Sequence, residues 1–150
     1  MRVVLDTNVM LVSISRRSPH HPIFRAFEEK QYELLVTTDI LLEYEEVIGE
    51  EMSTNIAENI VKGIRDAHNA PYIHKYFYWN LISVDPDDNK FVDCAVAGAA
   101  DFIVTDDRHF KVLKSIPFPK VKVITADDFV EMLTGVRPEK RERLSKKKSH

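Results

Sequence analysis

The sequence Arg-Val-Val-Leu-Asp-Thr-Asn-Val, residues 2–9, decides the fold. Its apolar run, Val3 to Leu5, is typical of a short strand buried on both faces of a parallel sheet, and the run stops at Asp6. Ligands of open α/β sheets bind beyond the carboxyl ends of the strands, so Asp6 lies where a functional acid is expected. A cap of the following helix or an Asx turn would also account for an aspartate here. Acids brought to the same edge by other segments would decide between the two interpretations.

Strand and helix patterns alternate along the rest of the chain. Apolar runs predict strands at residues 32–36, 81–84, 101–105 and 120–125, and apolar residues at helical spacing predict helices within residues 23–27, 40–48, 54–68, 86–100 and 126–133. This alternation indicates an α/β protein with a parallel, helix-covered sheet. Residues 1–134 are expected to form one domain, and residues 135–150 a basic, disordered tail.

The composition limits the class of protein. A chain of 150 residues can bury one sizeable core, at roughly two thirds of its unfolded surface, without a disulfide or structural metal. The single cysteine, Cys94, lies in an apolar run and is interpreted as a small core residue rather than a nucleophile. We find no charged and apolar leader and no membrane-length apolar run, so a soluble, cytoplasmic protein is expected.

Charge is distributed unevenly along the chain. The formal net charge is −3, but seven basic and two acidic residues between Arg137 and Lys148 give that stretch +5, so the remaining chain carries −8. A basic tail could attract phosphate while the acidic body holds a metal ion. A disordered, solvated terminus is the simpler interpretation of the tail.

One glutamate is distinguished by its position in a helix. The apolar residues from Ile40 to Ile48 recur at helical spacing after the second strand, and Thr38 or Asp39 is predicted to be the N-cap. Glu43 lies one turn into this helix, where its side chain leans back toward the strand ends. The later glutamates of the helix are expected to be solvated.

Two further groups of acids lie at predicted strand ends or helix starts. The segment Asp-Pro-Asp-Asp-Asn-Lys-Phe, residues 85–91, places Asp88 at a helix N-terminus, where the helix dipole favours negative charge, and Asp93 follows one turn later. Capping explains at least two of these acids, but four acids in nine residues exceed what one cap requires. The strand predicted before Asp106 and Asp107 also ends in acids.

Other conspicuous residues carry weaker signals. The segment 70–79 interleaves aromatic and basic residues, a composition that can stack on unpaired bases, but its near-helical spacing favours core or a dimer interface. Arg16 and Arg17, in the loop after the first apolar stretch, could contact a phosphate backbone. His20 and His21 are interpreted as surface residues, because no acid or cysteine lies nearby at ligand spacing.

Acids from four separate segments thus fall at one edge of the expected sheet. Two unit charges about 4 Å apart repel by around 4 kcal/mol at an effective dielectric constant of 20, so such a cluster needs cations. Oxygen ligands suit Mg²⁺ or Mn²⁺, and the lack of a nearby Cys/His set argues against zinc. Because such ions bind both the attacking water and the leaving oxygen of a phosphodiester, nucleic-acid hydrolysis is the leading hypothesis. The acids are Asp6, Glu43, Asp88 or Asp93, and Asp107 or Asp106.

Four motifs, in this order, resemble the PIN-domain family, in particular its branch of toxins from toxin–antitoxin pairs. They are Val-Val-Leu-Asp-Thr-Asn-Val at residues 3–9, Glu43 on its helix, the Asp-Pro-Asp-Asp-Asn-Lys-Phe segment, and Phe-Ile-Val-Thr-Asp-Asp-Arg-His-Phe at residues 102–110. The resemblance covers residues 1–134. It implies a three-layer α/β/α sandwich with a mainly parallel, Rossmann-like sheet, and a Mg²⁺- or Mn²⁺-dependent endoribonuclease acting on RNA. By analogy it also implies an antitoxin protein as partner and a homodimer.

The resemblance also assigns roles to individual residues. The expected catalytic and metal-binding acids are Asp6, Glu43, Asp88 and Asp107. The polar residues that orient ligands or water correspond to Thr7, Asn8 and Thr105. Asp93 is an additional candidate ligand. Where the family commonly has Thr-Gly-Asp, this chain has Thr105-Asp106-Asp107, so the choice between the two acids stays open.

Two other functions are compatible with acids at strand ends. A receiver-type phosphoacceptor domain also gathers acids there, but it needs an adjacent acidic pair near the first strand, which residues 2–6 lack. A non-catalytic protein-interaction or RNA-binding module would use the acids as caps or partner contacts. That module predicts no binding of divalent ions, whereas a nuclease predicts stabilisation by Mn²⁺.

Overall fold

The sheet of this protein is small, parallel and buried at its centre. The computed structural model describes residues 1–75 and 77–138, and within them the strand order is β2-β1-β3-β4, with every neighbouring pair parallel. The strands are β1 (Arg2–Leu5), β2 (Glu33–Leu34), β3 (Phe102–Val104) and β4 (Val123–Ile124). Register sets Val3 opposite Phe102 and Leu5 opposite Val104. The quoted apolar run therefore forms a central strand, as predicted.

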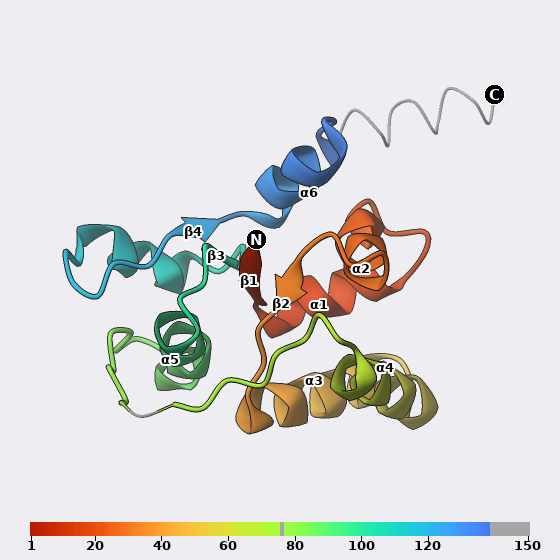
Figure 1. Ribbon diagram of the computed structural model, residues 1–150, viewed down its shortest axis with the longest axis horizontal. Coiled ribbons are helices and arrows are strands. Elements are labelled where there is room, and N and C mark those ends of the chain that lie inside the picture. The colour runs from red at the N-terminus through yellow and green to blue at the C-terminus, as the bar shows by residue number, and fades with distance from the viewer. Residues whose placement is uncertain (76, 139–150) are drawn as a thin grey trace.

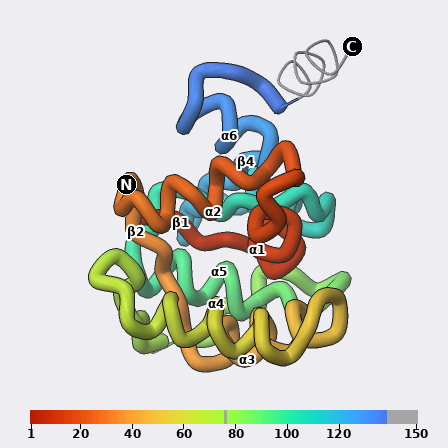
Figure 2. The backbone as a smooth tube through the Cα atoms, turned by 90° about the vertical axis from the view of Figure 1, so that its right-hand side faces the viewer, coloured from red at the N-terminus to blue at the C-terminus, as the bar shows by residue number. Residues whose placement is uncertain are grey.

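Helices cover both faces of this sheet. The α-helices are α1 (Thr7–Ile14), α2 (His21–Glu28), α3 (Thr38–Glu51), α4 (Thr54–Asp66), α5 (Asn89–Ala97) and α6 (Ala126–Thr134), and two 3-10 helices are η1 (Pro86–Asp88) and η2 (Arg108–Ser115). Figure 1 shows the strands near the middle of the molecule. Figure 2 shows α2 and α6 on one side of them and α3, α4 and α5 on the other. The predicted three-layer α/β/α sandwich is confirmed.

One predicted helix start differs from the structure by a small shift, whereas a predicted helix end agrees with it. The N-cap of α3 is Thr37, whose hydroxyl accepts a hydrogen bond from Ile40 N at 3.3 Å, so the prediction of Thr38 or Asp39 is wrong by one or two residues. Thr37 can cap because its backbone is extended while the next residue is already helical. α6 ends at Thr134, and Gly135 after it adopts φ +80°, a conformation that favours glycine at a helix C-terminus. Of the predicted tail, residues 135–150, the part from residue 139 onward lies outside the described residues.

The strand predicted at residues 81–84 is not formed. Ile82 is buried, but its backbone N–H donates to Asn89 Oδ1 at 2.9 Å and its carbonyl accepts from Asn89 Nδ2 at 2.8 Å. The Asn89 side chain therefore takes the place of a neighbouring strand. An apolar run alone cannot show whether a ladder partner or a side chain will satisfy the backbone.

The described residues of the aromatic segment 70–79 form no helix, and their aromatic side chains are mostly outside the core. Phe77 and Tyr78 are each 71% exposed, Tyr72 is also exposed, and Trp79 is half-buried. The core interpretation is therefore wrong for these residues, while the dimer interface stays a prediction, and Tyr76 lies outside the described residues. The side chain that is buried close to this segment is an aliphatic one, that of Ile82.

The remaining features agree with a conventional core. Cys94 is fully buried and unpaired, and burial raises the pKa of its thiol to about 12, which fits a core residue and not a nucleophile.

Within the part of the chain that the structure describes, no helix combines the length and apolar character needed to cross a bilayer.

Replacement of Asn89 should test its role as a substitute strand partner. Asn89→Ala is expected to lower the free energy of unfolding by about 2–4 kcal/mol, because two buried backbone groups of Ile82 lose their partners. Urea unfolding of the purified protein measures this change.

The matched control is Asn55→Ala, which removes the same amide from an exposed position of α4. That variant should stay within about 0.5 kcal/mol of the parent protein. Equal stability of the two variants would show that the contacts of Asn89 with Ile82 contribute little.

Candidate metal centre

Asp6 lies at the carboxyl end of β1 and is buried, with 6% of its surface exposed. It occupies the N-cap position of α1, yet its side chain makes no capping hydrogen bond. Its Oδ2 accepts instead from the Thr105 hydroxyl at 2.7 Å. Burial raises the pKa of Asp6, and the charges of Asp107 and Glu43 raise it further, while the hydrogen bond from Thr105 lowers it. The helix-cap interpretation of Asp6 therefore does not account for its carboxylate.

Thr105 connects the ends of the two central strands. Its hydroxyl donates to Asp6 and accepts from the backbone N–H of Asp107 at 3.0 Å. Asp107 then caps η2, because its Oδ1 accepts from His109 N at 2.8 Å. A hollow of about 330 Å³ opens beside these acids. It is lined by Asp6, Asn8, Val9, Val12, His20, Asp106 and Asp107.

Glu43 reaches the same edge from α3. The Thr7 hydroxyl donates to Glu43 Oε2, and the ammonium of Lys90 lies 2.7 Å from Glu43 Oε1. The buried hydroxyl of Tyr44 donates to Leu5 O at 2.5 Å, which fixes α3 against the end of β1. Glu43 is thus held beside Asp6 by contacts from both of its neighbouring segments.

Lys90 supplies a positive charge beside Glu43 at this edge. It is a residue of α5 whose side chain is only 14% exposed, and it also pairs with Asp87 at 2.9 Å. These two acids raise the pKa of Lys90 against the opposing effect of its burial. Because Lys90 neutralises Glu43, the remaining uncompensated charge belongs to the aspartates.

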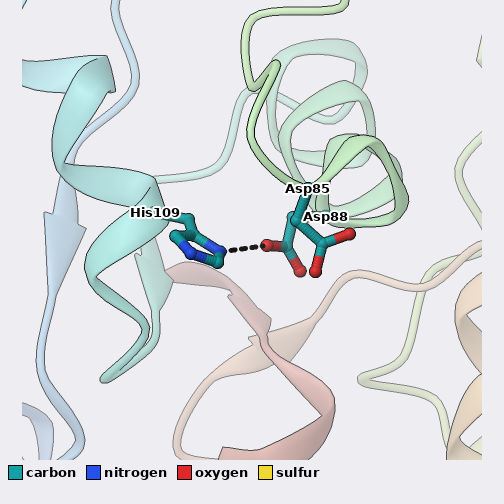
Figure 3. A group of neighbouring side chains, drawn as sticks. All are labelled: Asp85, Asp88 and His109. Carbon is teal, nitrogen blue, oxygen red and sulfur yellow. Dashed lines mark ion pairs between the residues drawn. The ribbon is translucent and has the colours of Figure 1, made fainter.

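Asp88 stands at the start of α5 and faces the beginning of η2, as Figure 3 shows. One ligand atom each from Asp85, Asp88 and His109 lie within 4.8 Å of one another. His109 Nδ1 is 3.6 Å from Asp88 Oδ2 and 3.3 Å from Asp107 Oδ1. Burial raises the pKa of Asp88 to about 6, with further increases from the charges of Asp85, Asp107 and Asp6.

Two buried atoms of this group lack hydrogen-bond partners among the described residues. They are Asp88 Oδ2 and His109 Nδ1, which face each other across 3.6 Å without hydrogen-bond geometry. Buried polar atoms are rarely left unpaired, so this pair indicates a missing third group between or beside them. The two carboxylates and one imidazole of this group are donors suited to a divalent cation. The residues present therefore fit a metal ion.

The other two candidate acids have different partners. Asp106 is exposed, and its Oδ1 accepts from Ala126 N at the start of α6 at 3.0 Å, although it also lines the hollow beside Asp6. Asp93 is buried and accepts from Trp79 N at 3.0 Å. The charges that act on Asp93 are those of Lys75 and Asp39 rather than those of the Asp6 group.

The supporting candidates lie at this centre, whereas Arg16 lines a different hollow, together with Arg25 and Leu133. Thr7 and Thr105 contact the acids as described, and Asn8 is exposed beside the hollow. Arg16 and Arg17 are exposed in the turn after α1 and remain candidate phosphate contacts.

Two residues of the centre were not anticipated from the sequence. Lys90 and His109 occur within the quoted motifs, but neither spacing nor composition shows that they meet Glu43 and Asp88. The nearest signal is local, since Lys90 lies three residues after Asp87 and His109 two residues after Asp107. The acids therefore have a cationic and an imidazole neighbour, and a single imidazole among carboxylates remains compatible with Mn²⁺.

Comparisons with known proteins agree with this arrangement. The family model described as PIN domain matches residues 2–109. The fold is similar to that of a chain in the crystal structure of VapBC2 from Rickettsia felis, which was solved bound to a DNA fragment from the VapBC2 promoter. The TM-score is 0.58 and the sequence identity 14%, and the match covers 83% of this chain and 98% of that chain. No curated protein matches this chain in sequence.

Neutralisation of Asp88 should stabilise the metal-free protein. Burial raises the pKa of Asp88 to about 6, so its ionised form disfavours folding. The contribution of Asp88 to the free energy of unfolding is therefore fully present below the unfolded-state pKa near 3.8 and is lost as the pH rises through about 6. Asp88→Asn removes this loss and is expected to gain roughly 1–2 kcal/mol at pH 7 in EDTA. Thermal unfolding in EDTA between pH 4 and 7.5 measures it, and the same variant should lose most of the stabilisation by Mn²⁺.

Asp128→Asn is the control of opposite sign. The hydrogen bond from Arg137 lowers the pKa of Asp128, so this exposed carboxylate does not oppose folding when ionised. The control variant should not gain stability at pH 7 and should keep the full response to Mn²⁺. A stability of Asp88→Asn that falls with pH like the parent's would contradict the assigned cost of Asp88.

Proposed function

The chain belongs to the PIN-domain family, and we propose that it is a Mg²⁺- or Mn²⁺-dependent endoribonuclease, the toxin of a toxin–antitoxin pair. One observation carries the proposal: Asp6, Asp88 and Asp107 converge from three segments and repel one another, and the buried atoms Asp88 Oδ2 and His109 Nδ1 lack hydrogen-bond partners among the described residues. Such an arrangement is costly in a protein that binds no cation there. It is the arrangement that hydrolysis of a phosphodiester by a metal site requires.

The residues that would hold the cation are Asp6, Asp88 and Asp107, with His109 as the imidazole neighbour of Asp88. When bound, a divalent cation lowers the pKa of a coordinated water and stabilises negative charge on the phosphate. The chemistry needs no nucleophile from the protein.

The chain's own residues orient this chemistry. Thr105 fixes the Oδ2 atom of Asp6 by donating a hydrogen bond to it. Glu43 accepts one hydrogen bond on each oxygen, and each oxygen keeps a further lone pair that can accept a proton or a hydrogen bond from the attacking water. Lys90 holds Glu43 in place, which makes Glu43 the candidate that positions and deprotonates water.

The toxin assignment and its partner rest on similarity. The shared fold with a chain of VapBC2 supports a small antitoxin protein as partner of this chain. The cytoplasm is the compartment that we propose for this activity.

The Asp6→Asn variant provides the decisive test. It is expected to lose at least about 100-fold in RNA cleavage, because a metal ligand is removed while the side-chain shape and the acceptor for Thr105 remain. A mixed pool of single-stranded and structured RNA is incubated with the parent in Mn²⁺, the parent in EDTA, and the variant in Mn²⁺. Circular dichroism verifies the fold.

Asp66→Asn, at the exposed end of α4, is the matched control and should cleave like the parent. Full activity of Asp6→Asn would refute the assigned site. An inactive parent without a thermal shift in Mn²⁺ would favour the non-catalytic binding module.

A further inference from the structure

One segment of the folded domain, which begins at the acidic centre, is rich in basic residues and has no acidic ones. Between Arg108 and Lys122 the chain has five basic residues and no Asp or Glu. Residues 1–107 and 123–136 together have nine basic and 22 acidic residues, a net charge of −13. The five basic residues are Arg108, Lys111, Lys114, Lys120 and Lys122. A segment of +5 within so acidic a domain is a separate electrostatic feature.

The geometry of η2 aligns three of these residues. In a 3-10 helix residues i and i+3 eclipse, about 6 Å apart along the axis. Phe110 and Leu113 therefore share one row, which is buried in the core, and Arg108, Lys111 and Lys114 share another, which is exposed. The burial of the apolar row fixes the outward direction of the basic row.

All five basic side chains are available to a partner. Each residue is exposed, and none forms an ion pair with any residue in the ranges 1–75 and 77–138. Lys122 lies 5.2 Å over the ring of Phe102, which leaves its charge at the surface. Elsewhere in the domain, partly buried cations such as Lys75 and Lys90 are paired with acids. The basic segment is therefore uncompensated within the described chain.

Exposed aromatic rings lie beside this segment. Phe118, between Lys114 and Lys120 in sequence, is 78% exposed and meets Trp79 edge-on with ring centroids 6.0 Å apart. Phe77, itself exposed, lies 6.1 Å from Trp79. Figure 1 shows the segment after β3 and the loop before α5 on the same side of the molecule. Cationic side chains and open aromatic faces thus occupy one surface.

We propose that this basic row, with Phe118 and Phe77, is the surface that guides single-stranded RNA to the metal centre, an inference that rests on the proposed ribonuclease function. Lys111, Lys114 and Lys120 contact the phosphates, and the aromatic rings stack on unpaired bases. The row begins one residue after Asp107, so a strand that follows it arrives at the acids. Stacking on open rings selects single strands, because the bases of a duplex are already stacked.

The test measures RNA binding separately from cleavage. A fluorescein-labelled 12-nucleotide RNA without secondary structure is titrated with Asp6→Asn protein in EDTA at several salt concentrations. In this background, Lys111→Gln/Lys114→Gln/Lys120→Gln should weaken binding by about tenfold or more at low salt. It should also reduce the slope of log Kd against log salt by about 2, because each phosphate contact to a single strand contributes about 0.7.

The matched control removes the same charge elsewhere. Lys30→Gln/Lys62→Gln/Arg65→Gln changes three exposed residues on α4 and in the turn before β2, at the opposite edge of the sheet from Asp6. Its affinity and salt slope should equal those of the Asp6→Asn parent. Equal losses in both triple variants would reveal a nonspecific effect of net charge and overturn the proposal.

A further variant separates stacking from charge. Phe118→Leu keeps an apolar side chain, and it should weaken binding of the single strand at least about fivefold with the salt slope unchanged. A duplex of the same sequence should bind more weakly than the single strand. Base stacking would be excluded if the parent bound the duplex as tightly as the single strand and if Phe118→Leu bound the single strand as tightly as the parent.

The outcomes distinguish this inference from the function on which it rests. If the folded parent protein cleaves no RNA in Mn²⁺, the proposed function is wrong. If the parent cleaves RNA but the triple lysine variant keeps the parent's slope of log Kd against log salt, this inference alone is wrong. An acidic protein would then be the partner to test on the basic surface.

Discussion

The hydrogen bond from the Thr105 hydroxyl to Asp6 joins the ends of the two central strands at the edge where the acids gather. It exists because the parallel register sets Leu5 opposite Val104, so the next residues of both strands meet. The backbone extends the pairing by one step, since Asp6 N donates to Val104 O at 3.1 Å. A register shift of one residue would turn these side chains to the other face. The centre therefore depends on the pairing of β1 with β3.

The outer strands are too short to position the rest of the centre. β2 and β4 have two residues each, and buried polar side chains connect the covering helices to the backbone instead. Tyr44 binds Leu5 O and holds α3, which carries Glu43, while Asn89 binds both backbone groups of Ile82 and holds the start of α5 beside Asp88. In a buried environment, loss of such a bond leaves an unpaired backbone group. Stability and the geometry of the acids are therefore coupled through a few side chains.

The sequence predicts those features that depend on local pattern. The apolar runs of β1 and β3 are buried because no polar residue interrupts them, and acids directly after a parallel strand must share its carboxyl edge. Features that depend on tertiary contact were missed or mistaken. Lys90 and His109 gain their roles only when α5 and η2 meet the strand ends, and the run at residues 81–84 has a side chain as its partner. The exposed Phe77 shows the same limit, because aromatic composition does not tell a core from a surface.

An acidic domain that is proposed to act on RNA, a polyanion, raises an electrostatic question that its net charge does not answer. At physiological ionic strength the screening length is about 8 Å, so most acids of α3 and α4 act weakly on a strand bound at the sheet edge. The charges within about 8 Å of a bound strand therefore decide whether the protein attracts or repels that strand. At the edge itself Lys90 compensates Glu43, the aspartates repel one another, and the basic residues of η2 begin directly after Asp107. For the proposed RNA strand, the row along η2 is therefore the favourable approach, because the rest of the surface is acidic. The order of charges along one short segment therefore matters more for RNA binding than the total of the chain.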